Sequence, residues 1–268
     1  ILKSKSKLNK IIINDLDVLS NEFSQDRKTN IIHNTEISKQ IIKKIKVSNE
    51  PMSVVLSSNG WIKAYKDLNI SLDTISYKSG DTYLSSLDIN NNKEVSFFDQ
   101  KGFLYSMNVN DVPTGRGYGE SLKKYFNIDD GVSVTGLINS SDDIQTLLLS
   151  ESGYGFICEN KNLKSFNKNG KSIIKNKDSN IFKPIPVNPK YFKYYVLITS
   201  NDYLLVGKLS DIPIMSKGKG VKLINIPKTD ISEKVVFSGV INQEHRIEIS
   251  AKNKRSKYIE FSELQPYI

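Results

Sequence analysis

The sequence contains one cysteine and two histidines, which are too few for several common kinds of site. A single cysteine, Cys158, cannot form an internal disulfide, and it follows the apolar residues Phe156 and Ile157. We interpret it as a buried, unreactive thiol in a reduced cytosol. His33 and His245 are far apart in the sequence, so histidine and cysteine together cannot supply the ligands of a zinc site.

Long apolar runs and nucleotide-binding loops are also missing. No stretch approaches the roughly 18 apolar residues of a membrane span, and the first residues lack the apolar core and cleavage site of a signal peptide. No Gly-x-x-x-x-Gly-Lys-Ser/Thr loop occurs, and the Gly115-x-Gly117-x-Gly119 segment does not have Rossmann spacing. We therefore expect no integral membrane segment and no cofactor in this chain. Because the chain begins at Ile1 inside a helical pattern, we expect it to be a piece of a longer protein.

Arginine is scarce, although the chain is strongly basic. Only four of the 38 basic residues are arginine, and the formal net charge is +9 with a pI of about 9.3. Such a charge favours an anionic partner, nucleic acid above all. The joint abundance of Lys, Asn and Ile is also what the codons of an AT-rich genome impose. Charge alone therefore leaves nucleic-acid binding and genomic drift as two open interpretations.

What the sequence does contain is one pattern that recurs about five times: a short apolar strand, a polar turn with Gly or Asn, and a second strand. A period of roughly 40–52 residues is typical of an array in which each repeat forms one four-stranded blade of a propeller. Such arrays present surfaces rather than clefts, which favours a binding module. The copies span residues 54–63, 95–105, 146–156, 195–205 and, more loosely, 246–259.

Three segments of the chain differ in pattern. Residues 1–24 carry an apolar stripe at helical spacing, residues 25–50 are polar and then Lys- and Ile-rich, and residues 51–268 alternate short strands with dense turn signals. We predict the end of a neighbouring helical domain, a linker, and an all-β domain of about five blades without a further helix. The stripe consists of Leu8, Ile11, Ile12, Leu16, Leu19 and Phe23.

Two loops at equivalent places in their repeats combine glycine with a cation. Residues 113–119 and 213–220 each follow an Asp-apolar-Pro step, and Arg116, Lys217 and Lys219 lie beside or between glycines. Glycine lets backbone N–H groups approach a phosphate, and the cation neutralises it. The alternative is that these are tight turns whose glycines only supply a positive φ. We favour phosphate contact, because two such loops occur in one basic repeat protein.

These loops and nearby lysines in other repeats form a set of candidate DNA contacts. Lys254 and Arg255 belong to a basic run, 252–257, that we expect to be a hairpin turn, where solvated charge and DNA contact are equally plausible. No nucleophile–base pair is recognisable, and the carboxylate pairs Asp129-Asp130 and Asp142-Asp143 are interpreted as solvated turn residues. The candidates are Arg116, Lys217, Lys219, Lys222, Lys63, Lys66, Lys168, Lys171, Lys254 and Arg255.

Several of these strings resemble one family. Gly-Arg-Gly-Tyr-Gly-Glu at 115–120, Ser-Gly-Tyr-Gly-Phe at 152–156 and the segments 54–63, 77–81 and 216–227 resemble the C-terminal domain of the A subunit of bacterial topoisomerase IV. Residues 26–29 are similar to the end of the long coiled-coil arm of that subunit. The resemblance covers about residue 50 to the end of the chain. It implies a β-pinwheel, whose blades exchange strands and which binds double-stranded DNA along its outer rim.

The resemblance also implies which functions lie elsewhere. The family's nucleophile is a Tyr that follows an Arg, and the four arginines here precede Lys28, Gly117, Ile247 and Ser256. No segment matches in full the Gln-Arg-Arg-Gly-Gly-Lys-Gly box of the related gyrase subunit, which favours topoisomerase IV. The chain is thus expected to be a non-catalytic part of a type IIA DNA topoisomerase.

Its expected partners are the remainder of its own polypeptide and the separate ATPase subunit, in a heterotetramer that uses ATP and magnesium. The expected location is the cytoplasm at the nucleoid. Peripheral membrane association of the whole topoisomerase is left as an open alternative. The alternative is a propeller-like protein-interaction module with no DNA role. Clustering of basic residues on one rim would distinguish the two, because an even scatter favours the alternative.

Overall fold

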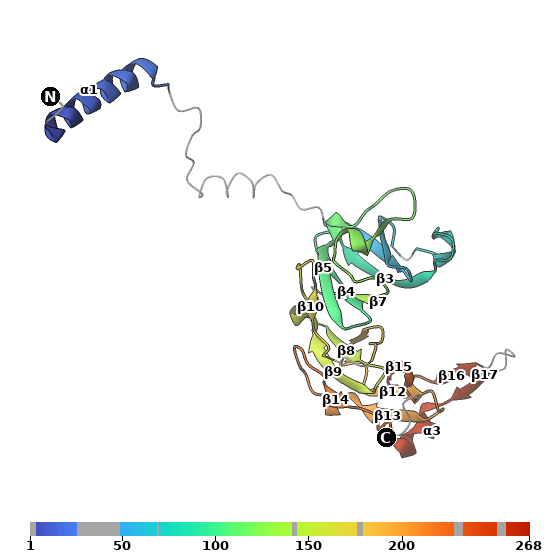
Figure 1. Cartoon of the computed structure of the whole chain (residues 1–268). Helices are drawn as coiled ribbons and strands as arrows, with labels where there is room; N and C mark the ends of the chain where they lie inside the picture. The colour runs from blue at the N-terminus through green and yellow to red at the C-terminus, as the bar shows by residue number, and fades with distance from the viewer. Residues whose placement is uncertain are drawn as a thin grey trace. The chain divides into compact units, whose positions relative to one another are not determined.

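A computed structural model describes residues 4–25, 49–68, 70–140, 144–175, 179–227, 233–250 and 256–268. The chain forms two compact units, Ile1–Val47 and Ser48–Ile268, coloured along the sequence in Figure 1. The first unit contains the helix α1 (Lys5–Phe23), and the second contains all the strands. Most of the expected linker, residues 26–48, lies outside the described residues. None of the described helices has the length and apolarity needed to cross a membrane.

Helix α1 lies where the apolar stripe predicts it. The chain enters it from Ser4 and leaves it at Ser24, both with extended backbone. None of its described side chains is buried, so the apolar stripe, including Leu16 and Phe23, is exposed in this chain. An exposed stripe of this kind is typical of a helix whose packing partner is another segment.

The second unit consists of small antiparallel sheets. Three sheets have four strands, in the orders β3-β1-β2-β6, β10-β5-β4-β7 and β11-β8-β9-β14, the fourth is β13-β12-β15, and the last is the pair β16-β17. The first two sheets comprise β1 (Pro51–Ser57), β2 (Trp61–Tyr65), β3 (Tyr83–Asn90), β6 (Glu120–Ser121), β4 (Glu94–Asp99), β5 (Phe103–Asn108), β7 (Val134–Asn139) and β10 (Lys171–Ser172). The others comprise β8 (Gln145–Leu149), β9 (Tyr154–Glu159), β11 (Ile185–Val187), β14 (Val221–Lys222), β12 (Tyr194–Thr199), β13 (Leu204–Lys208), β15 (Val235–Ile241), β16 (Ile247–Ser250) and β17 (Ser256–Ile259).

Neighbouring sheets exchange strands. The chain completes the hairpin β4-β5 of the second sheet before β6, yet β6 pairs with β2 of the first sheet. In the same way β10 follows β8-β9 and pairs with β5, and β14 follows β12-β13 and pairs with β9. We call β6, β10 and β14 the exchange strands. This arrangement confirms the propeller-like, strand-exchanging fold that the resemblance implies.

The exchange strands mark one edge of each four-stranded sheet, and neighbouring sheets meet at the other. Strand β3 of the first sheet packs against β7 of the second, and β11 of the third sheet packs against β15 of the fourth. Strands β3, β7 and β11 are each the edge strand opposite the exchange strand of their own sheet, and β15 is the corresponding edge of the fourth sheet. Between the first and second sheets, and between the third and fourth, the exchange strands therefore lie at the edge opposite the one where the two sheets contact each other.

Each of the four main hairpins turns on the same local geometry. The last residue of the turn has a positive φ, of 75° at Gly60, 84° at Gly102, 79° at Gly153 and 63° at Asp202. Its N–H donates to the carbonyl three residues earlier, as Gly60 does to Ser57. A left-handed residue closing a short turn matches the twist of antiparallel strands, and glycine adopts it without steric cost. The first four predicted repeats are thereby confirmed as hairpins.

The core lies between successive sheets, because the strands are apolar on both faces. On β4, Phe97 packs toward the first sheet and Phe98 toward the third, and both are fully buried. On β8, Leu148 packs toward the second sheet and Leu149 packs toward the fourth. Alternating side chains point to opposite faces of a strand, so a continuous apolar run serves two interfaces.

The fifth copy of the repeat differs from the other four. It forms only the two-stranded hairpin β16-β17, so the array has four blades and this hairpin rather than five equal blades. The expectation of no helix after residue 51 is wrong, since α3 (Phe261–Leu264) follows the hairpin. Phe261 and Leu264 are buried against Val196 and Ile241 of the fourth sheet. One helical turn is too short to show a helical period in sequence.

Candidate nucleic-acid interface

The segment before each exchange strand is a loop held at both ends. At its start a loop carbonyl accepts a hydrogen bond from the second hairpin strand of the preceding sheet, and at its end the chain donates back to the turn residue. The starting bonds are Ala64 N–H to Pro113 O, Ser106 N–H to Ser165 O and Ile157 N–H to Pro213 O. The closing bonds are Leu122 N–H to Gly60 O, Ile173 N–H to Gly102 O and Leu223 N–H to Gly153 O. Three loops, residues 113–119 (first), 165–170 (second) and 213–220 (third), therefore occupy equivalent places at the exchange-strand edge.

The last glycine of the first and third loops is required by packing. A Cβ on Gly119 would lie 2.2 Å from the carbonyl oxygen of Ile62, and one on Gly220 would lie 2.2 Å from that of Gly155. Both residues also have a positive φ. For these two glycines the tight-turn interpretation suffices. Gly115 and Gly117 differ, because nothing lies within 4 Å of a Cβ there, although their φ angles are also positive.

The first loop brings Arg116 and Lys63 to one edge of the first sheet. Arg116 is exposed between Gly115 and Gly117. The Lys63 Nζ donates to the Gly117 carbonyl at 2.8 Å and lies 4.7 Å from the centre of the Tyr65 ring. Lys63 thus supports the loop that carries Arg116, while its ammonium stays at the surface.

The third loop carries Lys217 and Lys219 next to exchange strand β14, which contains Lys222. All three are exposed. The Lys219 Nζ lies 4.0 Å from the centre of the Tyr154 ring, and the Lys222 Nζ donates to Asn225 Oδ1 at 2.6 Å. Gly218 ties this loop to the preceding exchange segment, because its N–H donates to Ile173 O and its carbonyl accepts from Lys175 N–H, both at 2.9 Å.

The remaining predicted cations lie in the second loop and after β2. Lys168 and Lys171 are exposed, and the Lys171 Nζ donates to Asn162 O at 3.4 Å. Lys66, which follows β2, is exposed as well. Lys254 and Arg255 lie outside the described residues. The structure therefore places seven of the ten predicted residues on exchange strands, their loops or the adjoining hairpin strand, and an eighth, Lys66, directly after that strand.

None of these eight cations forms an ion pair with a carboxylate in the described part of the chain. Other lysines at the same sheets do: Lys101 pairs with Asp129 at 2.9 Å, and Lys123 pairs with Asp130 at 2.6 Å. Asp129 and Asp130 are exposed, as expected of turn residues, but each is neutralised by a lysine. The hydrogen bond that the Lys101 ammonium donates to the Asp129 carboxylate raises the pKa of Lys101. Asp142 and Asp143 lie outside the described residues.

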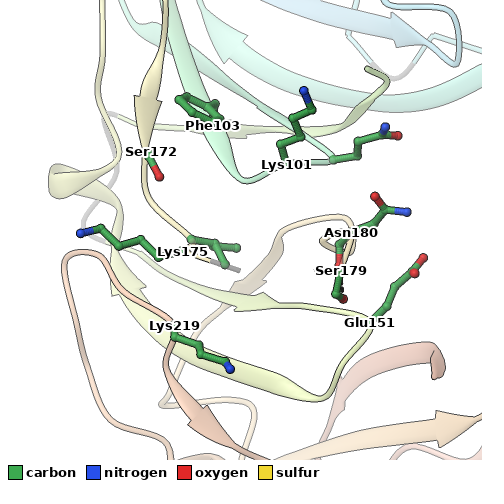
Figure 2. A pocket seen from close by; sticks show the side chains of 10 residues that line it. Lys101, Phe103, Glu151, Ser172, Lys175, Ser179, Asn180 and Lys219 are labelled. Atoms are coloured by element: carbon green, nitrogen blue, oxygen red, sulfur yellow. Dashed lines mark hydrogen bonds between the residues drawn. The ribbon is translucent and has the colours of Figure 1, made fainter. Parts of the chain in front are cut away.

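An open cleft of about 1050 Å³ lies where the second and third sheets adjoin. Figure 2 shows Lys101, Lys175 and Lys219 around it, from a hairpin turn, the segment after β10 and the third loop. Ser172, Ser179 and Asn180 add polar groups to its wall, and Glu151 adds one carboxylate, which also lies 3.5 Å from the Lys234 ammonium. Lys101 and Lys175 are missing from the sequence-based set. Their only sequence signal is proximity to Gly102 and to Lys171.

The sequence-based set of DNA contacts also lacks the aromatic residues next to these cations. Trp61, Phe103 and Tyr154 each follow the turn glycine and lie opposite an exchange-strand residue. The Lys78 Nζ lies 3.6 Å from the centre of the Trp61 ring. The signal in sequence is an aromatic residue directly after the turn in four successive repeats, Tyr203 being the fourth.

Metal-binding side chains do not gather in the described part of the chain. No group of three or more His, Cys, Asp or Glu in the described ranges could bind a metal ion. Cys158 is fully buried, and burial raises the pKa of its thiol to about 11. This confirms the interpretation of Cys158 as a buried core residue, and its low reactivity stays a prediction.

Comparisons with known proteins agree with this architecture. A family model, DNA gyrase C-terminal domain, beta-propeller, matches residues 100–141 and 193–242. The solved E. coli ParC C-terminal domain is 30% identical with a TM-score of 0.72, over 81% of this chain and 89% of that one. A solved C-terminal domain of DNA topoisomerase IV, at 20% identity and a TM-score of 0.67, shares the fold over 81% of this chain and 69% of that one.

Whole-length relatives extend the comparison. The A subunit of DNA topoisomerase 4 from Haemophilus influenzae is 30% identical over 87% of this chain and 31% of its own length. The Escherichia coli K12 protein of the same name is 30% identical over 86% of this chain and 30% of its own length. The chain therefore spans about a third of the length of the curated relatives it matches.

Proposed function

Because this chain belongs to the family of C-terminal domains of topoisomerase IV A subunits, we propose that it holds a segment of double-stranded DNA along its exchange-strand edges. The held segment would be presented to the rest of the enzyme for ATP-dependent strand passage, in decatenation, relaxation and chromosome segregation. The chain itself contributes binding and no cleavage chemistry.

The observation that carries this proposal is the repetition of unpaired cations at one structural position. Arg116 in the first loop, Lys168 in the second and Lys217 in the third are exposed, and each loop is anchored in the same way. A cation with a carboxylate partner must lose it to bind phosphate, whereas these cations have none in the described ranges. Contacts of this kind position a DNA backbone without reading its sequence.

The cleft between the second and third sheets supports the same function. Lys175 and Lys219 reach it from two loops that are joined through Gly218. A phosphate placed there would meet two ammonium groups and the hydroxyl of Ser172. We therefore add Lys175 to the proposed DNA contacts.

The other activities belong, in this proposal, to the remainder of the enzyme. The relatives are A subunits of DNA topoisomerase 4, a type II topoisomerase. DNA cleavage, magnesium and ATP hydrolysis would be supplied by the remainder of the same polypeptide and by the ATPase subunit, in a heterotetramer at the nucleoid in the cytoplasm.

The test is duplex binding by a triple variant, Arg116→Ala, Lys217→Ala and Lys219→Ala, titrated at several salt concentrations. We expect weaker binding to all sequences alike and a plot of log K against log salt that is flatter by about 0.9 per lost contact, or up to about 3. The matched control is Lys183→Ala, Lys190→Ala and Lys193→Ala, which removes the same charge from exposed positions away from the exchange strands.

Three outcomes would contradict the proposal. If the folded triple variant binds duplex DNA as the wild type does, the loops are not the DNA contacts. If both triple variants lose the same affinity, binding depends on net charge rather than on this edge. Wild-type chain that binds no duplex at low salt would favour the protein-interaction module.

A further inference from the structure

Two lysines near the exchange strands are paired with carboxylates, unlike the eight predicted cations. Lys123 lies two residues after exchange strand β6, and Lys101 lies in the turn of the β4-β5 hairpin, at the cleft between the second and third sheets (Figure 2). The Lys101 Nζ contacts Asp129 at 2.9 Å, and the Lys123 Nζ contacts Asp130 at 2.6 Å. One short segment before β7 therefore neutralises a lysine on each side of it.

A segment in the same place lies beside the hairpin turn of each of the first four sheets. The N–H of the first turn residue donates, at 2.8 Å each time, to a carbonyl of the segment that leads into β3, β7, β11 or β15. The bonds are Ser58 N–H to Thr82 O, Gln100 N–H to Ser133 O, Glu151 N–H to Asn180 O and Ser200 N–H to Lys234 O. These four carbonyls mark equivalent positions, so the segments can be compared residue by residue.

Two adjacent carboxylates occur at this place only beside the second sheet. Asp129 and Asp130 lie four and three residues before Ser133. The corresponding residues are Lys78 and Ser79 before Thr82, Asn176 and Lys177 before Asn180, and Asp230 and Ile231 before Lys234. Residues 176, 177, 230 and 231 lie outside the described residues and are compared by sequence alone. At the next junction along the chain, a lysine thus stands where the second sheet has Asp130.

The clefts at the first two junctions differ in the same sense. Ser121 and Ser172 are the second residues of their exchange strands, and each lines a cleft. The cleft at Ser121, where the first and second sheets adjoin, has a volume of about 210 Å³, and its cation is the paired Lys123. The cleft at Ser172 has a volume of about 1050 Å³ and includes Lys175 and Lys219, which form no ion pair among the described residues.

A carboxylate beside a lysine opposes phosphate binding in two ways. The phosphate must displace it from the ammonium, and the carboxylate then stays close to the phosphate as a like charge. The hydrogen bond from the Lys123 ammonium lowers the pKa of Asp130, so this carboxylate is ionised at neutral pH. Both carboxylates are exposed, and exposed ion pairs contribute little to folding stability. Their removal should therefore change DNA binding and leave the fold intact.

We propose that Asp129 and Asp130 reduce duplex binding at the junction of the first and second sheets. Each carboxylate holds one lysine, Lys101 or Lys123, that would otherwise contact a DNA phosphate. This role, which rests on the proposed function, specifies how the edge is divided: duplex DNA is held more strongly at the cleft between the second and third sheets than at the junction before it.

The test is the double variant Asp129→Asn and Asp130→Asn in the 268-residue chain, titrated with duplex DNA between about 50 and 200 mM salt. We expect tighter binding and a plot of log K against log salt that is steeper by about 0.9 for each released lysine, or about 1.8 in total. The gain in affinity should therefore be about 12-fold larger at the lower salt concentration than at the higher. If the double variant does not fold, each single variant should steepen the plot by about 0.9.

Two further proteins show whether the released lysines cause the gain. The matched control, Glu244→Gln and Glu263→Gln, removes the same charge from exposed positions outside the exchange strands and their loops, and its salt slope should equal that of the wild type. Adding Lys101→Ala and Lys123→Ala to the double variant should abolish the gain and return the salt slope to the wild-type value.

Three outcomes would overturn the proposal while the wild type still binds duplex DNA. The first is a folded double variant with wild-type affinity and slope. The second is an equal gain in the matched control, because net charge would then set the affinity. The third is a gain that survives the loss of both lysines. If neither the wild type nor the double variant binds duplex at low salt, the proposed function fails, and the role of the two carboxylates fails with it.

Discussion

Replacing Gly220 by alanine should destabilise the β-domain far more than replacing Gly117, although both glycines have a positive φ in a Gly-cation-Gly loop. At Gly220 the new Cβ would lie 2.2 Å from the Gly155 carbonyl oxygen, which is backbone and cannot swing aside. At Gly117 nothing lies within 4 Å. Comparing the two variants therefore separates the free-energy cost of a left-handed backbone from the free-energy cost of placing a Cβ against the Gly155 carbonyl.

The magnitudes follow from the contacts. A left-handed conformation costs a non-glycine residue about 1–2 kcal/mol, and both variants carry this cost. At Gly220 the exchange strand β14 must also move away from β9, which loosens the pairings of Val221 and Lys222 and the 2.8 Å bond from Leu223 N–H to Gly153 O. Two or three hydrogen bonds at about 0.5–1.5 kcal/mol each add about 2–3 kcal/mol.

The assay is equilibrium unfolding in urea, with the free energy of unfolding extrapolated to water. Gly117→Ala should lose about 1–2 kcal/mol and Gly220→Ala about 3–5 kcal/mol. In a domain of this size the difference corresponds to a melting temperature lower by about 4–12 °C for Gly220→Ala. Equal losses in the two variants would refute the reasoning, because the exchange strand would then accommodate a Cβ without moving.

Two further predictions concern buried groups. With a pKa of about 11, Cys158 should be about one part in a thousand thiolate at pH 8, and its reaction with a disulfide reagent should be at least about 100-fold slower in the folded chain than in urea; similar rates would show that the thiol is accessible. Asp99 accepts hydrogen bonds from Lys101 N–H, Phe103 N–H and Tyr105 O–H, and burial raises its pKa. Asp99→Ala should therefore lower the free energy of unfolding by about 2–3 kcal/mol, and a loss below about 0.5 kcal/mol would contradict this role.

The sequence by itself determined the local elements. A polar turn closed by Gly60, Gly102 or Gly153 needs only its neighbours to form, so the hairpins could be predicted one by one. The amphipathic stripe of α1 and the burial of Cys158 in an apolar strand are local signals as well. The positions of Arg116 and Lys217 in exposed loops followed from glycine content alone.

Only the tertiary structure decided how these elements are joined. Exchange strands such as Glu120–Ser121 are two residues long and carry no strand period, so their pairing depends on a hairpin that lies about 60 residues earlier in the chain. The need for glycine at 119 and 220 arises from a carbonyl of that distant strand. The meeting of Lys101, Lys175 and Lys219 at one cleft has the same origin.

The open edge of β13 shows the difference most directly. Residues 195–205 repeat the pattern of the other hairpins, and nothing in them distinguishes a covered strand from an open one. Among the described residues β13 is the edge of its sheet, whereas β2, β5 and β9 are each covered by an exchange strand from the following repeat. Strand pairing between distant segments is a property of the assembled sheets, and local sequence cannot specify it because each strand encodes only its own conformation and faces.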